Sequence, residues 1–274
     1  MEDTACVAFL QWALPRLGLR WAGFRRVRRQ VGKRIDRRLR ALGLADVADY
    51  RAHLETCAEE WRVLDGLCRI PISRFWRDRG VFVHLGEVVL PDLARAAADR
   101  GEGRLRCWSA GCASGEEPYS LAIAWVLAAA VRSPPVGFEV VATDADEHLL
   151  ERARAARYGA GSLKELPPAW RETAFTPSGA DFVLRAGLRD HVALLRQDIR
   201  EEAPPGRFDL VLCRNLAFTY FDEPVQRGVV RRIADALVAG GALVVGAHER
   251  LPAGVESHVS PWAAKLGIYR KRGA

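Results

Sequence analysis

A glycine-bounded turn and a downstream aspartate are the residues of this chain best suited to binding chemistry. The turn Gly111–Gly115, Gly-Cys-Ala-Ser-Gly, lies between the apolar run Arg104–Ala110 and another apolar segment that begins at Glu116. Asp144 closes a further apolar run, 29 residues after Gly115. Such a turn lets a ligand approach the backbone at a helix N-terminus, and an acid at the end of the next strand accepts hydrogen bonds from ribose hydroxyls. The pattern therefore indicates a nucleoside site.

The turn differs from the dinucleotide fingerprint Gly-x-Gly-x-x-Gly, and Asp144 lies farther along the chain than the about 20 residues typical of that fingerprint. A nucleoside without a pyrophosphate is therefore expected. S-Adenosylmethionine fits, because its ribose can meet Asp144 and its cationic methionine end can meet nearby acids. From the pattern alone, a turn that only joins a strand to a helix stays a second interpretation.

The segments around the turn predict an α/β fold with a doubly wound, Rossmann-like sheet, because a strand, a turn, a helix, a strand and a helix follow one another. The expected strands are Arg104–Ala110, Gly137–Asp144, Phe208–Asn215 and Gly240–Gly246, with Tyr269 in a last strand, and the expected helices are 116–131, 147–157 and 224–238. Residues 181–185 and 191–195 flank Gly187 and predict a small β-hairpin inserted in this unit.

Residues 1 to about 70 predict a separate helical subdomain with one strongly basic helix. Apolar residues recur there in steps of three and four on one face, at Phe24, Val27, Val31, Ile35, Leu39 and Leu42. Arg25, Arg29, Lys33 and Arg37 form a basic stripe on another face. Gly43 is expected to end this helix and Asp46 to cap the next one. Residues 16–40 carry ten Arg and one Lys against one acid, a net charge of +10, whereas the whole chain carries only +7.

Composition limits the class of protein. With 274 residues, of which 49% are hydrophobic and 27% charged, the chain can form a sizeable core. Its longest nearly uncharged run, Tyr119–Val131, is shorter than the roughly 20 residues of a membrane span. The acidic start Met1–Thr4 does not resemble a signal peptide, so a cytoplasmic protein is expected. The six cysteines include no Cys-x-x-Cys pair, so we expect free thiols and no bound metal.

Five stretches, in order, resemble the CheR-type protein-glutamate methyltransferases of bacterial chemotaxis. The longest is Trp108–Ser120, which looks very much like the family's signature around the glycine turn. The others are Phe75-Trp76-Arg77, Ala142-Thr143-Asp144, Cys213-Arg214-Asn215-Leu216 with Thr219-Tyr220-Phe221, and Gly246-Ala247-His248-Glu249, in which the spacing is altered. The resemblance covers nearly the whole chain and implies an S-adenosylmethionine-dependent carboxyl O-methyltransferase, whose second product is S-adenosylhomocysteine.

The resemblance also implies which residues bind the cofactor. Glu117 would hold the methionine amino group, Asp144 the ribose, and Asn215 and Leu216 would line the adenosine or methionine side. The other cofactor residues implied in this way are Ser73, which replaces the family's threonine, Arg77, Gly111, and Asp198-Ile199 in place of the family's Asn-Leu beside the adenine. An aspartate can still accept a hydrogen bond from the adenine amine.

Arg77 and Tyr220 are the implied catalytic residues. Arg77 would hold the substrate carboxylate, and Tyr220 would face the transferred methyl group. A glutamate side chain is already ionised at neutral pH and the sulfonium activates its own methyl group, so no general base is needed. Each residue has a plainer interpretation, Arg77 as a surface arginine and Tyr220 as a core aromatic.

The resemblance divides the chain at residue 75. Residues 1–75 would form a basic, substrate-recognising helical subdomain, and residues 76–274 the cofactor-binding domain, with the β-hairpin subdomain near 178–196. The stripe Arg25, Arg29, Lys33 and Arg37 suits an acidic helical protein such as the cytoplasmic domain of a chemoreceptor. A solvated face or a nucleic-acid surface are the alternatives, of which nucleic acid is the least favoured. A monomer is expected.

Several residues depart from the family pattern, namely Cys68, Pro71–Arg74, Phe218 and Thr219. These departures leave two other functions open. The same fold could methylate a different acceptor, either a small-molecule acid or a protein outside chemotaxis. Alternatively, the chain could bind the cofactor as a regulator that no longer catalyses.

Overall fold

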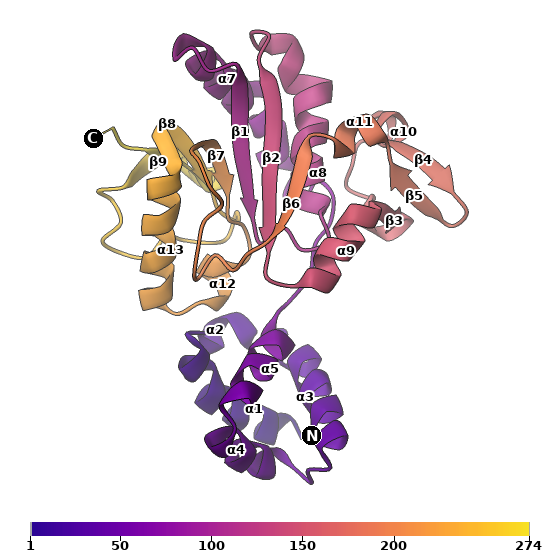
Figure 1. The fold of residues 1–274 in the computed structure, drawn as a ribbon, viewed down its shortest axis with the longest axis vertical. Coiled ribbons are helices and arrows are strands. Elements are labelled where there is room, and N and C mark those ends of the chain that lie inside the picture. Colours follow the sequence, from indigo (N-terminus) through magenta and orange to yellow (C-terminus); the bar gives the residue numbers. More distant parts are fainter. Residues whose placement is uncertain (1, 274) are drawn as a thin grey trace. The chain divides into compact units, whose positions relative to one another are not determined.

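A computed structural model describes residues 2–273, which form two compact units (Figure 1). One unit is built from the chain up to Ile70 together with Thr219–Gln226, and the other from Pro71–Phe218 together with the chain from Arg227 onwards. The sequence patterns gave no sign that the short segment 219–226 belongs with the N-terminal helices. This segment includes Tyr220, so the fold assigns that residue to the helical unit.

The first unit is helical, as expected. Its elements are α1 (Asp3–Ala13), η1 (Leu14–Leu17), α2 (Trp21–Phe24), α3 (Arg28–Leu42), α4 (Val47–Thr56) and α5 (Ala58–Cys68). The basic helix α3 begins four residues later than its apolar periodicity suggests, because Phe24 ends α2. Gly43 ends α3 in a left-handed conformation, and the Asp46 side chain caps α4 by accepting hydrogen bonds from Ala48 N and Asp49 N.

The second unit contains a seven-stranded sheet in the order β6-β2-β1-β7-β8-β10-β9. Five strands are parallel, and the last two pair in antiparallel fashion at one side. The strands are β1 (Arg104–Ala110), β2 (Gly137–Asp144), β6 (Val192–Arg196), β7 (Phe208–Leu212), β8 (Leu237–Val244), β9 (Val259–Ala263) and β10 (Ile268–Lys271). The predicted doubly wound sheet is therefore confirmed, although β9 was not anticipated.

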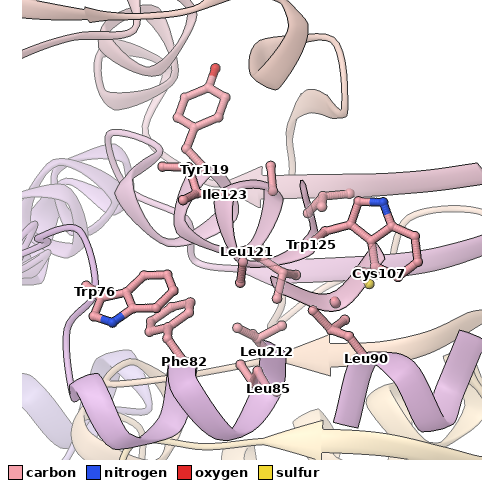
Figure 2. Close-up of a cluster of buried hydrophobic side chains, with 14 of the residues drawn as sticks. Trp76, Phe82, Leu85, Leu90, Cys107, Tyr119, Leu121, Ile123, Trp125 and Leu212 are labelled. Atoms are coloured by element: carbon pink, nitrogen blue, oxygen red, sulfur yellow. The ribbon is translucent and has the colours of Figure 1, made fainter. Parts of the chain in front are cut away.

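Helices on the two faces of this sheet bury its apolar side chains. They are α6 (Arg79–His84), the π-helical turn η2 (Leu85–Val89), α7 (Leu90–Asp99), α8 (Glu116–Ala124), α9 (Glu147–Ala155) and, drawn on the opposite face in Figure 1, α13 (Glu223–Ala236). The expected helix 116–131 is α-helical only to Ala124, beyond which a π-helical turn, η3 (Trp125–Ala129), and a short 3₁₀ turn, η4 (Ala130–Arg132), follow. Figure 2 shows the core between these helices and the sheet, where Trp76, Leu90, Cys107, Leu121 and Leu212 converge.

The predicted pairing of residues 181–185 with 191–195 is wrong. β5 (Asp181–Leu184) instead lies between β3 (Arg157–Gly159) and β4 (Phe175–Ser178) in a separate three-stranded antiparallel sheet. The hairpin turn is at Gly179, whose φ of 66° suits glycine. The short helix α11 (Ala186–Arg189) follows β5, and residues 192–196 then pair with β2 in parallel. The apolar alternation was visible in the sequence, but the partner of each strand was not.

Two further elements complete the second unit, η5 (Ala160–Ser162) and α10 (Pro168–Ala174), both next to the small sheet in the chain. The short helix α12 (Ala217–Tyr220) and the turn η6 (Ala264–Leu266) connect the later strands. Among the helices of residues 2–273, none combines the length and the hydropathy needed to cross a bilayer. All six cysteines are free thiols, and only Cys57 is not buried.

Candidate functional site

The glycine turn lies at the carboxyl end of β1 and is fixed to the neighbouring strand β2. Both Gly111 N and Cys112 N donate to Thr143 O, over 2.8 and 2.9 Å. Gly111 has a φ of 78°, and a Cβ atom there would lie 2.3 Å from Leu216 Cδ2, so only glycine allows this close approach. The predicted ligand-facing turn therefore has a backbone that a side chain would disrupt.

Asp144 ends β2 beside this turn, with its carboxylate held in place by backbone groups. Ala113 N donates to Asp144 Oδ2 and Asp146 N donates to Asp144 Oδ1, each over 2.9 Å. Ala113 itself has a left-handed backbone, with a φ of 48°. An anionic acceptor whose orientation is fixed before ligand arrives is suited to a ribose diol.

Glu117 lies in the first turn of α8 and is brought to the ends of β1 and β7. Its Oε1 accepts a hydrogen bond from Ser109 Oγ at 2.9 Å, and its Oε2 lies 3.1 Å from Arg214 Nη1. The Glu117 side chain is only 13% exposed. Burial raises the pKa of Glu117, against the opposing effects of Arg214, the Ser109 hydroxyl and Arg77. A buried carboxylate of this kind is suited to a cationic amino group.

The segment that carries Arg77 is anchored just before this residue by two aromatic side chains. Phe75 makes edge contacts with Tyr158 and Phe175 of the small sheet, and Trp76 stacks on Phe82. The backbone is tied as well, since Phe75 N donates to Ser162 O and Trp76 N donates to Ser120 Oγ. The segment is therefore fixed to the domain immediately before Arg77.

The side chain of Arg77 is less tightly held than its backbone. Its Nη1 donates to Ile72 O over 2.8 Å, and the residue is half-buried. Ser73, the other predicted residue of this segment, is also half-buried. A side chain on an anchored backbone can reach a ligand without reordering the chain.

Asn215 and Leu216 follow β7, and Leu216 lies against Gly111 of the glycine turn. Asn215 has a φ of 56°, an unusual conformation for a non-glycine residue, and its N–H donates to Glu249 Oε2 over 2.7 Å. The same oxygen accepts from Gly246 N over 2.7 Å, so one carboxylate joins the ends of β7 and β8. Leu216 packs where a side chain at Gly111 would stand.

The predicted adenine-side pair differs from expectation in one respect. Ile199 is buried, but the Asp198 carboxylate forms an ion pair with Arg200, with Oδ2 2.7 Å from Nη2, and also accepts from Arg200 N. The Asp198 carboxylate, which the resemblance places as acceptor of a hydrogen bond from the adenine amine, therefore already has an internal partner. This ion pair could not be predicted from residue types, because arginine is common throughout the chain.

Tyr220 and the basic stripe belong to the helical unit. The Tyr220 ring lies 5.2 Å from that of Phe24 in an edge contact, and its carbonyl accepts from Arg20 N. Arg25, Arg29, Lys33 and Arg37 are all exposed, and among residues 2–273 their side chains have no hydrogen-bonded or ion-paired partner. Other arginines of this basic region are internally bonded, among them Arg28 to Asp3, Arg34 to Leu67 O and Arg38 to Glu60.

Sequence reasoning passed over two residues of this site, Arg214 and Glu249. Both stand within stretches that carry the family resemblance, yet neither was expected to bind anything. Arg214 is buried, with a side chain 1% exposed, and it contacts Glu117 directly. Glu249 is a hydrogen-bond acceptor for Asn215 N. A buried position for an arginine is rare enough to be informative, but burial is not visible in the sequence.

The family model and the curated relatives that match this chain indicate the same family. The family model "CheR methyltransferase, SAM binding domain" matches residues 72–266. A probable chemotaxis protein methyltransferase of Rhizobium etli is 33% identical, over 84% of this chain and 86% of that protein. The chemotaxis protein methyltransferase of Salmonella typhimurium is 34% identical, over 81% of this chain and 76% of that protein. Among solved structures, the N-methyltransferase NodS of Bradyrhizobium japonicum with S-adenosylhomocysteine is 14% identical over 67% of this chain and 86% of that chain, with a TM-score of 0.37.

Proposed function

The chain belongs to the CheR family of S-adenosylmethionine-dependent methyltransferases, and on this premise we propose that it forms methyl esters on glutamate side chains of a chemoreceptor-like protein. The observation that supports the proposal most is the joint position of two carboxylates and an arginine segment. Asp144, Glu117 and the segment that carries Arg77 are all fixed by contacts with the ends of β1, β2 and β7 or with α8.

The cofactor supplies an activated methyl group, and the residues of this chain bind and orient it. Asp144 would accept hydrogen bonds from the ribose, and the buried Glu117 would pair with the amino group of the methionine moiety. Gly111 would let the ligand approach the backbone of the turn. Asn215, Leu216 and Ile199 would line the remaining sides, with Ser73 on the segment before Arg77.

The transfer itself is a direct displacement. With the cofactor bound, an oxygen of the substrate carboxylate would take the methyl carbon in one displacement, and the electron pair of the broken carbon–sulfur bond would stay on sulfur. The products are a methyl ester and S-adenosylhomocysteine, and no proton has to move because the glutamate is ionised at neutral pH. Arg77 would hold the carboxylate in line at about 3 to 3.5 Å from the methyl carbon, and Tyr220 would orient it.

Acceptor recognition is proposed to use the basic stripe, of which Arg29, Lys33 and Arg37 lie on α3, whereas Arg25 lies between α2 and α3. Cations that stabilise a fold are generally paired, as Arg28, Arg34 and Arg38 are. The four stripe residues are exposed, and the part of the chain described here offers them no partner. Exposed cations without an internal partner, three of them at four-residue steps along α3, complement an acidic helix of a partner protein. The relatives that are about one-third identical over the aligned residues include chemotaxis protein methyltransferases.

The proposal is tested by following the methyl group. Purified protein, tritiated S-adenosylmethionine and membranes from the source organism should give a labelled membrane protein that releases volatile methanol in alkali, as methyl esters do. Label that resists alkali, or that enters only small molecules, would instead support a different acceptor. The departures at Pro71–Arg74 and Phe218 are the features that favour that second function. Tight cofactor binding with no transfer would indicate a regulator.

A further inference from the structure

Arg214 is a deeply buried charged group near the predicted site. It directly follows the Cys213 that ends the apolar run of β7, and its side chain is 1% exposed. Its guanidinium lies over the ring of Phe82, 5.2 Å from the ring centre. A buried arginine needs hydrogen-bonded anionic partners, because an unpaired charge in such a place is strongly destabilising.

The partners of this guanidinium belong to two different parts of the site. Nη1 lies 3.1 Å from Glu117 Oε2, on α8. Nη2 donates to Arg77 O over 2.9 Å and to Asp78 Oδ2 over 2.8 Å, on the segment that precedes α6. The two arms of one planar group therefore join the residue expected to hold the cofactor amino group to the backbone of the residue expected to hold the substrate carboxylate.

The Arg77 segment depends on such contacts for its conformation. Trp76 and Asp78, on either side of Arg77, both have a φ of 62°. Left-handed backbone is unfavourable for residues other than glycine and persists only where surrounding contacts impose it. Trp76 is held by its ring contacts and by Ser120, whereas Asp78 is held by Arg214. Arg214 thus fixes the segment on the side of Arg77 that the aromatic anchors do not reach.

We propose that Arg214 is a positioning residue that sets both halves of the reaction, by keeping Glu117 ionised for the cofactor amino group and by fixing the backbone of Arg77 for the substrate carboxylate. The second half of this inference rests on the proposed function. The first half rests only on the binding of S-adenosylmethionine.

The charge around Glu117 explains the first half. The groups that face this carboxylate are Arg214 from the end of β7, Arg77 from its segment, and the Ser109 hydroxyl from β1. Cys112 and Cys213 lie near enough for the Glu117 charge to contribute to their raised pKa values, so both are neutral thiols. Burial already raises the pKa of Glu117. Without Arg214 that pKa would rise further, and a protonated Glu117 could not pair with an ammonium group.

Two substitutions separate the two halves. Arg214→Gln removes the charge, whereas Arg214→Lys keeps a charge but loses the planar fork that reaches two partners at once. Arg100→Gln is the matched control, because Arg100 pairs with the buried Asp209 and contacts no residue predicted to belong to the site. Thermal unfolding of all three variants reports the loss of stability that comes from breaking a buried ion pair.

Calorimetry with S-adenosylhomocysteine between pH 7.5 and 6 tests the cofactor half. We expect Arg214→Gln to bind about tenfold more weakly at pH 7.5, with a further fall towards pH 6 that the wild type and Arg100→Gln do not show. For Arg214→Lys we expect nearly unchanged binding but a kcat lower by about 100-fold, since a small displacement of Arg77 is enough to disturb the in-line geometry.

Each outcome decides a part of the inference. If Arg214→Gln does not fold, Arg214→Lys still distinguishes a change in kcat from a change in affinity. Unchanged kcat in Arg214→Lys would overturn the role of Arg214 in placing Arg77. If a folded Arg214→Gln binds S-adenosylhomocysteine with an affinity that does not depend on pH, the role of Arg214 in keeping Glu117 ionised is overturned. If the wild type transfers no methyl group to glutamate, the proposed function fails, while the calorimetry still decides whether Arg214 acts on Glu117.

Discussion

At the scale of single residues, several side chains of the candidate site are held in place by hydrogen bonds from the protein itself. Asp144 illustrates this, because two backbone N–H groups hold its two oxygens. A carboxylate oxygen can accept more than one hydrogen bond, so Asp144 remains suited to a ligand hydroxyl. Ligand binding then does not have to order the Asp144 carboxylate, which would reduce the binding free energy.

Asp144→Ala should therefore abolish detectable binding of S-adenosylhomocysteine. Two hydrogen bonds to a charged group contribute about 3 kcal/mol or more, which corresponds to at least a 100-fold loss of affinity. Calorimetry at constant pH measures the loss. Asp146→Asn is a suitable control, since Asp146 caps α9 and asparagine is an equally good cap. Unchanged affinity in Asp144→Ala would mean that the ribose site lies elsewhere.

Tyr220→Phe should leave cofactor affinity unchanged and lower turnover by about tenfold or more, which is the value of one hydrogen bond to a charged group. The variant keeps the ring that packs on Phe24, so the helical unit should stay folded. Steady-state kinetics at saturating cofactor, together with calorimetry, separate the two effects. A variant as active as the wild type would make Tyr220 a packing residue only.

At the scale of elements, the close packing of the glycine turn against the strand ends restricts which residue types these positions tolerate. Gly111 combines a left-handed backbone with a contact to Leu216, so it is restricted by conformation and by space at once. This coupling links the end of β1 to the segment after β7, where Asn215 and Leu216 lie.

Gly111→Ala should lower the stability of the protein by about 1 to 3 kcal/mol and weaken binding of S-adenosylhomocysteine. Gly228→Ala is the matched control, because a Cβ atom at Gly228 meets nothing within 4 Å and alanine favours the helix α13. The thermal unfolding temperature of Gly228→Ala should thus equal or exceed that of the wild type. A Gly111→Ala variant with native stability and affinity would show that the turn tolerates a side chain.

At the scale of the whole molecule, the charge is concentrated on one helix. The chain carries a net charge of +7, and α3 with the residues before it supplies more than all of it. Only part of that charge is used inside the fold, through Arg28, Arg34 and Arg38. The exposed stripe is the part of this charge that we propose to contact an acceptor protein.

Reversal of the stripe, Arg29→Glu with Lys33→Glu, should raise KM for a protein acceptor by about tenfold or more at low salt, without altering affinity for S-adenosylhomocysteine. The effect should shrink as salt rises, because exposed charges are screened over about 10 Å at 0.1 M. Arg62→Glu, an exposed arginine on α5, serves as the control. Equal KM values for both variants would indicate that the stripe is only a solvated face.

Much of the fold could be predicted from the sequence, since hydrophobic periodicity fixes the type of each long element. The strands β1 and β2, the turn, and the caps at Gly43 and Asp46 follow from local residue types. Strand partners depend on contacts distant in the sequence, so the pairing of β5 and β6 was predicted wrongly.

The site could be predicted only in part, for a similar reason. Asp144 and Glu117 stand beside a turn that is recognisable from the residues. Arg214 and Glu249 act through burial and through hydrogen bonds to backbone groups of other elements. The partner of Asp198, Arg200, is close in sequence, but one arginine among many gives no signal of an ion pair.

The most direct test of the central claim is to locate the transferred methyl group in the acceptor. Membranes labelled by the purified protein would be digested, and tandem mass spectrometry would identify the modified side chain. We expect methyl esters on glutamate residues of an acidic helical segment, absent when Asp144→Ala replaces the wild-type protein. Methyl groups on nitrogen atoms, or on a small acid only, would contradict the account.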